Sequence, residues 1–170
     1  LSGSGAYGIL AAIINNPASD NGDGVSGGGI EVMETSLQRI TIRNNIVSRN
    51  DFFTILAEDV PVSALTVDHN LIDGFRGQYG ELRGTDYVEG NPRFVNADGA
   101  DFHLLPDSPA IDRGSVSAAP DHDYDTAPRP NNVLWDIGAY ELQAGPQLPV
   151  ANLTANPVSG IAPLAVAFTD

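Results

Sequence analysis

The chain has 170 residues, of which 42% are hydrophobic, and it carries a net charge of −14 because 22 acidic residues face eight arginines and no lysine. A nucleic-acid-binding protein needs basic side chains to neutralise phosphates, and an anionic membrane surface would repel this chain, so we expect neither partner. The sequence contains no cysteine, which excludes disulfides, and no apolar run of the length that membrane insertion needs.

Glycine and proline are abundant, with 18 and 12 residues, and this composition favours short strands and turns over helices. The first ten residues, LSGSGAYGIL, contain neither an initiator methionine nor a basic leader, so we expect a piece of a longer protein. A missing signal peptide then gives no information about export. Solvation alone explains the acidic surface, and cation binding or a salty habitat are the alternatives.

Two segments of the chain align without a gap at a spacing of 25 residues, the first beginning at Gly28 and the second at Phe53. Six apolar positions and one asparagine match. The matched positions are Ile30 and Ile55, Val32 and Ala57, Ile40 and Leu65, Ile42 and Val67, Asn45 and Asn70, and Ile46-Val47 and Leu71-Ile72. Self-similarity at a fixed period of this length is typical of repeat architectures.

Each repeat contains short runs of alternating apolar and polar residues, such as ITIRN at residues 40–44 and LTVDH at residues 65–69. One unit cannot bury its apolar face alone, whereas stacked parallel units can. We therefore expect Asn45 and Asn70 to lie one strand spacing apart, about 5 Å, with their amides bonded to each other. Two chance alternating hairpins in a β-sandwich are the alternative.

This pattern, written IxIxNNxI, resembles the coils of right-handed parallel β-helix proteins. The resemblance covers about residues 5–90 and implies an all-β chain whose residues 1–90 form the coils. We expect YGILAAIINN, residues 7–16, to belong to a less regular coil, and residues 17–29 to form a loop between strands.

After Gly90 the period ends, and residues 91–144 resemble the choice-of-anchor Q domain, a module at the C-terminal end of β-helices in exported proteins. The matching residues are Asn91-Pro92, Phe94-Val95, Asp101 to Leu104, Ser108 to Asp112, Gly114, Pro128 to Pro130 and Asp136 to Glu141. Thr126 and Ala127 stand where the family usually has glycine. The resemblance implies a cap, to which FVN, FHLL, PAID and IGAYE would add final rungs and so cover the exposed edge of the last coil.

Residues 145–170 are expected to hold a linker and the first strands of a β-sandwich, since PVANLTANPVSGIAPLAVAFTD resembles the start of a PKD domain. A lone strand carrying Leu164, Val166 and Phe168 cannot bury these side chains by itself. We therefore expect residues 150–170 to take their pairing edge from another chain or from the rest of such a domain.

Three alternating aspartates, Asp121, Asp123 and Asp125, suit a hard cation with oxygen ligands, and Asp136 would complete the site, so Ca²⁺ is the expected cofactor. Glu141 could also contribute, but it lies on the opposite face of a regular strand from Asp136 unless Gly138 introduces a bulge. The alternative is that these acids bond the backbone of their own loop. The acid–glycine run SDNGDG, residues 19–24, favours tight turns over a metal site.

No catalytic constellation is visible, so we leave open whether the chain is an enzyme. Polysaccharide lyases with this fold use an arginine near acids from several coils, and Arg43 and Asp68 fall on equivalent positions, but a simple ion pair between rungs explains both. Glu31, Glu58 and Asp59 are acids on or near strands without the defined pairing that a glycosidase needs. His69 is expected to point away from Asp68.

These observations predict the C-terminal part of an extracellular or cell-surface β-helix protein that serves display, adhesion or contact with a polysaccharide. The alternative is the tail of a polysaccharide lyase or glycosidase whose active site lies on upstream coils. Fold alone cannot decide between them, and residues that bind a substrate are not predicted.

Overall fold

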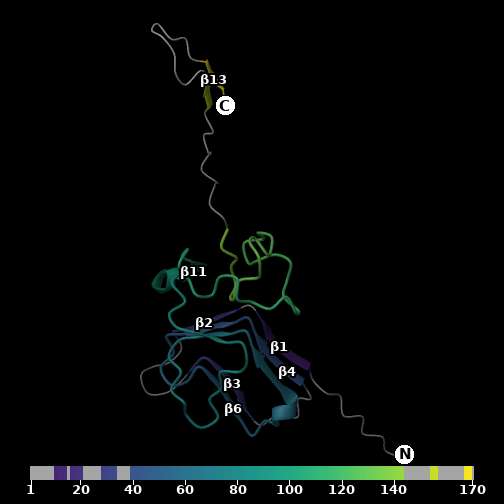
Figure 1. Ribbon diagram of the computed structural model, residues 1–170. Coiled ribbons are helices and arrows are strands. Elements are labelled where there is room, and N and C mark those ends of the chain that lie inside the picture. Colours follow the sequence, from purple (N-terminus) through teal and green to yellow (C-terminus); the bar gives the residue numbers. More distant parts are fainter. Residues whose placement is uncertain are drawn as a thin grey trace, which may run out of the picture.

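The chain folds into short β-strands joined by turns (Figure 1). The computed structural model describes residues 10–14, 16–20, 28–33, 39–143, 154–156 and 167–169. Within these ranges there are no α-helices, only two short 3₁₀ turns, Val62–Ala64 and Ala97–Gly99. No helix in the described residues is long and apolar enough to cross a membrane. The all-β class expected from the sequence is confirmed.

Three sheets are built only from parallel strands. The first contains β1 (Leu10–Ile14), β4 (Arg39–Arg43) and β7 (Leu65–Asp68). The second contains β2 (Pro17–Ser19), β5 (Ile46–Ser48), β8 (Leu71–Ile72) and β9 (Val88–Glu89). The third contains β3 (Ile30–Met33) and β6 (Ile55–Glu58). The chain visits the three sheets in turn and then returns to the first, so the strands of each sheet come from successive passes of the chain.

The 25-residue repeat sets the register of these sheets. Ile30 pairs with Ile55, Ile40 with Leu65 and Ile46 with Leu71, as the sequence alignment requires. Asn45 and Asn70, which are 25 residues apart, lie on adjacent rungs, with the Nδ2 of Asn45 3.0 Å from the Oδ1 of Asn70. The predicted stacking in register is therefore confirmed for these two repeats.

The rung that precedes these two repeats is four residues longer than the 25-residue period. Leu10 pairs with Arg39 and Pro17 with Ile46, and Asn16 meets Asn45 across a separation of 29 residues. Pro17–Ser19 is a strand, so the predicted loop over residues 17–29 is wrong at its start. Pairing with β5 supplies the hydrogen bonds of this strand.

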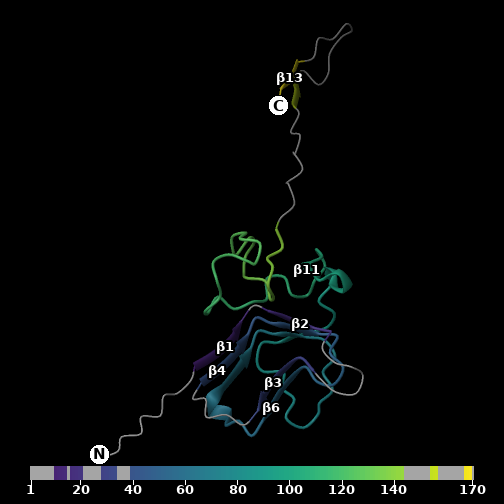
Figure 2. The same cartoon turned by 180° about the vertical axis from the view of Figure 1, so that it is seen from behind.

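Apolar side chains from all three sheets pack together inside the stack. This inner cluster consists of Ile30, Ile40, Ile42, Val47, Ile55, Val67 and Ile72. Figures 1 and 2 show the strands on three sides of one stack: β1 and β4 on one side, β2 on the second, and β3 and β6 on the third. Burial of these isoleucine and valine side chains is the main force that holds the rungs together.

The corners between sheets repeat as well. Asn44 and His69 both have left-handed backbone, with φ of 56° and 50°, and so do Asp59 and Gly84, with φ of 55° and 76°. At Gly84 an added Cβ would lie 2.1 Å from the carbonyl oxygen of Val67, so only glycine fits that corner. Equivalent turn geometry on successive rungs keeps the strands in register.

Residues 91–143 do not extend the stack, contrary to the expectation of final rungs. β10 (Phe94–Asn96) and β11 (Asp101–Leu104) pair antiparallel with each other. The PAID and IGAYE segments form turns and bends, and the isolated bridges of this region, Gly114 to Trp135 and His122 to Pro128, lie outside both segments. We call residues 91–143 the covering module, because they lie alongside the β2–β5–β8–β9 sheet (Figure 2).

Near the C-terminal end, β12 (Thr154–Asn156) pairs antiparallel with β13 (Ala167–Thr169). The strand that contains Phe168 thus has its partner in the same segment, whereas the sequence suggested a partner edge from elsewhere. Leu164 and Val166 lie outside the described residues, and pairing with another chain stays a prediction.

Candidate binding site

The covering module is attached to the stack through the outer face of the second sheet. Ile46 and Leu71 point away from the inner cluster and pack with Leu104, Ala110 and Ile137 of the module. All five are buried, with at most 4% of their surface exposed. An added Cβ at Gly138 would lie 2.7 Å from the Cδ1 of Ile46, so the module backbone approaches the sheet too closely for a side chain there.

Polar bonds fix the same interface. The side chain of Asn44 donates to the carbonyl of Ser115 and accepts from its N–H, both at 2.8 Å. The carbonyl of Asn44 accepts from the N–H of Gly138 at 2.8 Å. One corner residue of the stack therefore holds two separate segments of the module.

Arg43 and Asp68 form the predicted ion pair between rungs. The two carboxylate oxygens of Asp68 accept from the Nε and Nη2 of Arg43 at 2.5 and 2.6 Å, and Nη1 donates to the carbonyl of Ser117. Hydrogen bonding to Arg43 holds the pKa of Asp68 below its usual value, although partial burial opposes this. His69 differs from the expectation, because its left-handed corner turns the ring back to within 3.2 Å of Asp68.

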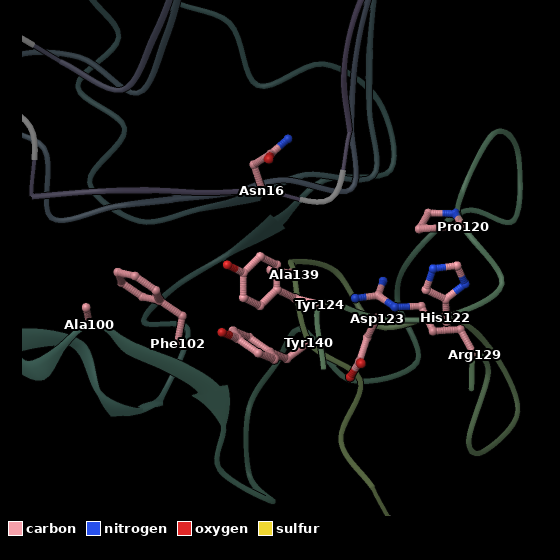
Figure 3. A pocket seen from close by; sticks show the side chains of 10 residues that line it. All are labelled: Asn16, Ala100, Phe102, Pro120, His122, Asp123, Tyr124, Arg129, Ala139 and Tyr140. Atoms are coloured by element: carbon pink, nitrogen blue, oxygen red, sulfur yellow. The ribbon is translucent and has the colours of Figure 1, made fainter. Parts of the chain in front are cut away.

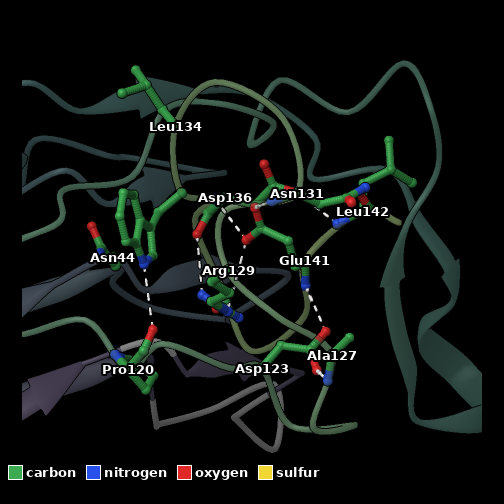
Figure 4. Close-up of polar contacts among 12 residues, drawn as sticks. Asn44, Pro120, Asp123, Ala127, Arg129, Asn131, Leu134, Asp136, Glu141 and Leu142 are labelled. Atoms are coloured by element: carbon green, nitrogen blue, oxygen red, sulfur yellow. Dashed lines mark hydrogen bonds and ion pairs between the residues drawn. The ribbon is translucent and has the colours of Figure 1, made fainter. Parts of the chain in front are cut away.

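A buried network of charged side chains organises the interior of the module (Figure 4). Asp136 is fully buried, and its two oxygens accept from the N–H groups of Asp112 and Leu142 at 2.8 and 2.7 Å. Glu141 accepts from the N–H groups of Asn131 and Asp136 at 3.0 and 3.1 Å. Asp136 and Glu141 stand at the two ends of the IGAY segment. Their side chains therefore join this segment to the loop before it in one turn.

Arg129 supplies the cation of this network. It is buried, its Nη2 donates to the carbonyl of Gly138 at 2.9 Å, and its Nε lies 3.7 Å from a carboxylate oxygen of Glu141. Burial raises the pKa of both Asp136 and Glu141 above the usual value, and their backbone hydrogen bonds and Arg129 only partly offset it. Burial also lowers the pKa of Arg129.

The four predicted metal ligands are used separately. Asp123 accepts from the N–H groups of Asp125, Ala127 and Glu141 at 2.8 to 3.0 Å, which is the loop-bonding alternative. Asp121 contacts the ring of His122, Asp125 contacts His103, and Asp136 belongs to the network above. In the part of the chain that the structure describes, no group of three or more His, Cys, Asp or Glu is placed to hold a metal ion. Calcium binding stays a prediction, and residues 21–24 of the SDNGDG run lie outside the described ranges.

The other acids considered for catalysis lie apart from the module. Glu31 is exposed on β3 and pairs with Leu56, and Glu58 ends β6 two residues after Leu56. Asp59 is exposed at the next corner. Glu81, which sequence reasoning did not single out, is buried and accepts from the N–H groups of Thr54, Arg76, Gly77 and Gln78. Its role is to hold a turn.

The sequence analysis also missed an aromatic cavity, which is lined by the covering module and by Asn16 of the stack. The cavity measures about 550 Å³, and its lining includes Phe102, Pro120, His122, Tyr124 and Tyr140 (Figure 3). Tyr124 and Tyr140 meet edge to face with ring centroids 5.7 Å apart. The available signal was the placement of one tyrosine in each of the two motifs DHDYD and DIGAYE.

His103 connects the cavity to the acidic loop. Its Nδ1 lies 2.6 Å from Asp101 and its Nε2 2.8 Å from Asp125, and its ring stacks on Tyr140 at a centroid distance of 3.9 Å. Burial lowers the pKa of His103, but the hydrogen bonds with Asp101 and Asp125 outweigh it, so the net shift is upward. His103 thus joins β11 to the loop that carries Tyr124.

We expect a pH titration of His103 to show this link. Because its pKa in the folded state is raised, the bridge stabilises the loop fully below about pH 6.5, the unfolded value, and this contribution is lost as the pH rises through the folded value. Side-chain NMR of the wild type should give a pKa above that of a free histidine, and Asp125→Asn should lower it. A wild-type pKa at or below the free value would contradict the bridge.

No protein-family model matches the chain, and no curated protein matches it either.

Proposed function

We propose that this chain belongs to an extracellular or cell-surface protein in which a right-handed parallel β-helix displays a glycan-contacting module and does not cleave the glycan. The β-helix is supported by three parallel sheets visited in turn and by one inner apolar cluster. The resemblance of residues 91–144 to the choice-of-anchor Q domain and of residues 145–170 to the start of a PKD domain supports a surface location.

The non-catalytic assignment rests on the contacts that the side chain of Arg43 makes. A lyase base must be free to take a proton from the substrate. The guanidinium of Arg43 instead binds both carboxylate oxygens of Asp68 and the carbonyl of Ser117. Its side chain is 15% exposed. It therefore joins two rungs and the covering module, which is a structural task.

The test measures binding and cleavage on the same samples. We expect the purified chain to be retained on immobilised glycans and to release no reducing ends or unsaturated products from any of them. Cleavage of a polyuronate or neutral glycan that is lost in Arg43→Ala would contradict the proposal and favour the lyase or glycosidase alternative. The control variant Arg113→Ala, at an exposed arginine of the module, should behave as the wild type.

A further inference from the structure

The aromatic cavity has the size of a ligand site. Its volume of about 550 Å³ lies within the range of roughly 300–1,000 Å³ that small ligands occupy. Tyr124 leaves 78% of its surface exposed, although it belongs to a packed group with Tyr140 and His103. In Figure 3 the hydroxyls of Tyr124 and Tyr140 both point to the side on which Phe102 lies.

Held aromatic rings of this kind suit a sugar. The C–H face of a pyranose ring packs on an aromatic ring, while the tyrosine hydroxyls can donate to and accept from the sugar hydroxyls. Tyr140 is held by stacking on His103, and His103 is held by Asp101 and Asp125, so the ring needs little ordering on binding. A tyrosine without such ring contacts would lose more entropy.

Charge decides which sugars fit. Asp101 and Asp125 do not line the cavity, but both bind His103, which stacks on the lining residue Tyr140, so two carboxylates lie beside the cavity against the one positive charge that His103 can carry. Asp121, on the same loop, is almost fully exposed. The arginine that lines the cavity, Arg129, is buried and bonded to the carbonyl of Gly138. With a net charge of −14 on the whole chain, a polyuronate meets repulsion both at a distance and in the site.

We propose that this cavity binds neutral or amino-sugar units of a glycan, with Tyr124 and Tyr140 as the stacking surface and with Asp101 and Asp125, which lie beside the cavity on His103, as acceptors for hydroxyl or ammonium groups that reach past the rings. The inference rests on the proposed glycan contact and adds its place and its ligand class. The inference also gives the acidic loop a role in ligand binding, in addition to the hydrogen bonds that its aspartates make to the backbone, because that loop carries both Tyr124 and Asp125.

The experiment measures the affinity of the whole chain for three oligosaccharides of equal length: a β-glucan, a glucosamine oligomer and a galacturonate oligomer. We expect the first two to bind and the third not to bind. Tyr124→Ala should weaken binding about tenfold or more, the loss of one good stacking contact. The matched control is Tyr79→Ala, because Tyr79 is 92% exposed and does not line the cavity. Asp125→Asn should weaken the glucosamine oligomer more than the β-glucan.

The outcomes separate the two proposals. Binding that Tyr124→Ala and Tyr79→Ala affect equally, or binding restricted to the galacturonate oligomer, would overturn the inference and leave the proposed glycan contact standing. An absence of binding to all three oligosaccharides and to a broad glycan array would overturn the proposed function itself. Circular dichroism and melting of Tyr124→Ala should match the wild type, so that lost binding cannot be ascribed to unfolding.

Discussion

Asn70→Ala should lower the free energy of unfolding by about 3 to 4 kcal/mol, since the variant loses four hydrogen bonds of a fully buried side chain and leaves their partners without replacement. The Oδ1 of Asn70 accepts from the backbone and side-chain amides of Asn45 at 2.9 and 3.0 Å. Its Nδ2 donates to the carbonyls of Ile42 and Asp68, both at 2.9 Å. This one side chain joins two rungs and closes the corner of its own rung.

Urea denaturation followed by far-UV circular dichroism measures the effect. The control is Asn132→Ala, at an exposed asparagine of the covering module, which should change the free energy of unfolding by less than about 0.5 kcal/mol. A loss below about 1 kcal/mol for Asn70→Ala would mean that the asparagine ladder does not hold the rungs together.

Asp136→Ala should destabilise the covering module by about 3 to 5 kcal/mol while the stack retains its structure. The substitution leaves the partly buried N–H groups of Asp112 and Leu142 without acceptors. It also removes one of the negative charges near the buried guanidinium of Arg129. The two N–H groups are partly buried, so we expect the module to open locally to satisfy them.

Hydrogen–deuterium exchange locates this opening. Exchange should rise over residues 105–143 and stay low over strands β4 to β8 of the stack. Asp121→Ala is the matched control, since Asp121 lies in the same module with its side chain 92% exposed. Equal loss of protection in the stack and in the module would show that the two parts do not open separately.

The order of the rungs could be predicted because periodicity is a local signal. A gapless alignment at 25 residues places Ile30 on Ile55, Asn45 on Asn70 and Arg43 on Asp68, and each of these pairs is in contact or in register in the structure. In a parallel stack the same chain path recurs on each rung, so the sequence offset becomes the strand register directly.

The packing of the covering module was not predicted, because it depends on contacts between distant residues. Ile46-Val47 and Leu71-Ile72 place two apolar side chains in succession, and in a strand such neighbours point to opposite faces. This pattern indicates a sheet that is covered on both sides. In the sequence alignment these pairs are only matched positions, and the alignment does not show that the outer face of this sheet is also apolar.

The role of the acids was likewise set by the long-range fold. Alternating aspartates predict a cation site when they converge, but here Asp123 turns inward to bond three backbone N–H groups while Asp125 turns outward to His103. The turn that Asp123 closes by accepting from the N–H of Ala127 includes the left-handed residue Thr126, with φ of 67°. The local sequence spacing does not contain this information.

A designed disulfide tests the 25-residue stacking on which the covering module and its cavity rest. The natural chain has no cysteine, so Thr41→Cys with Thr66→Cys introduces the only two thiols. These positions are register partners on β4 and β7, which places their Cα atoms about 5 Å apart, within disulfide range. We expect mild oxidation of the folded protein to join them completely. Arg39→Cys with Thr66→Cys, shifted by two residues to about 8 Å, should stay reduced. Efficient closure of the shifted pair, or failure of the aligned pair to close, would contradict the stack.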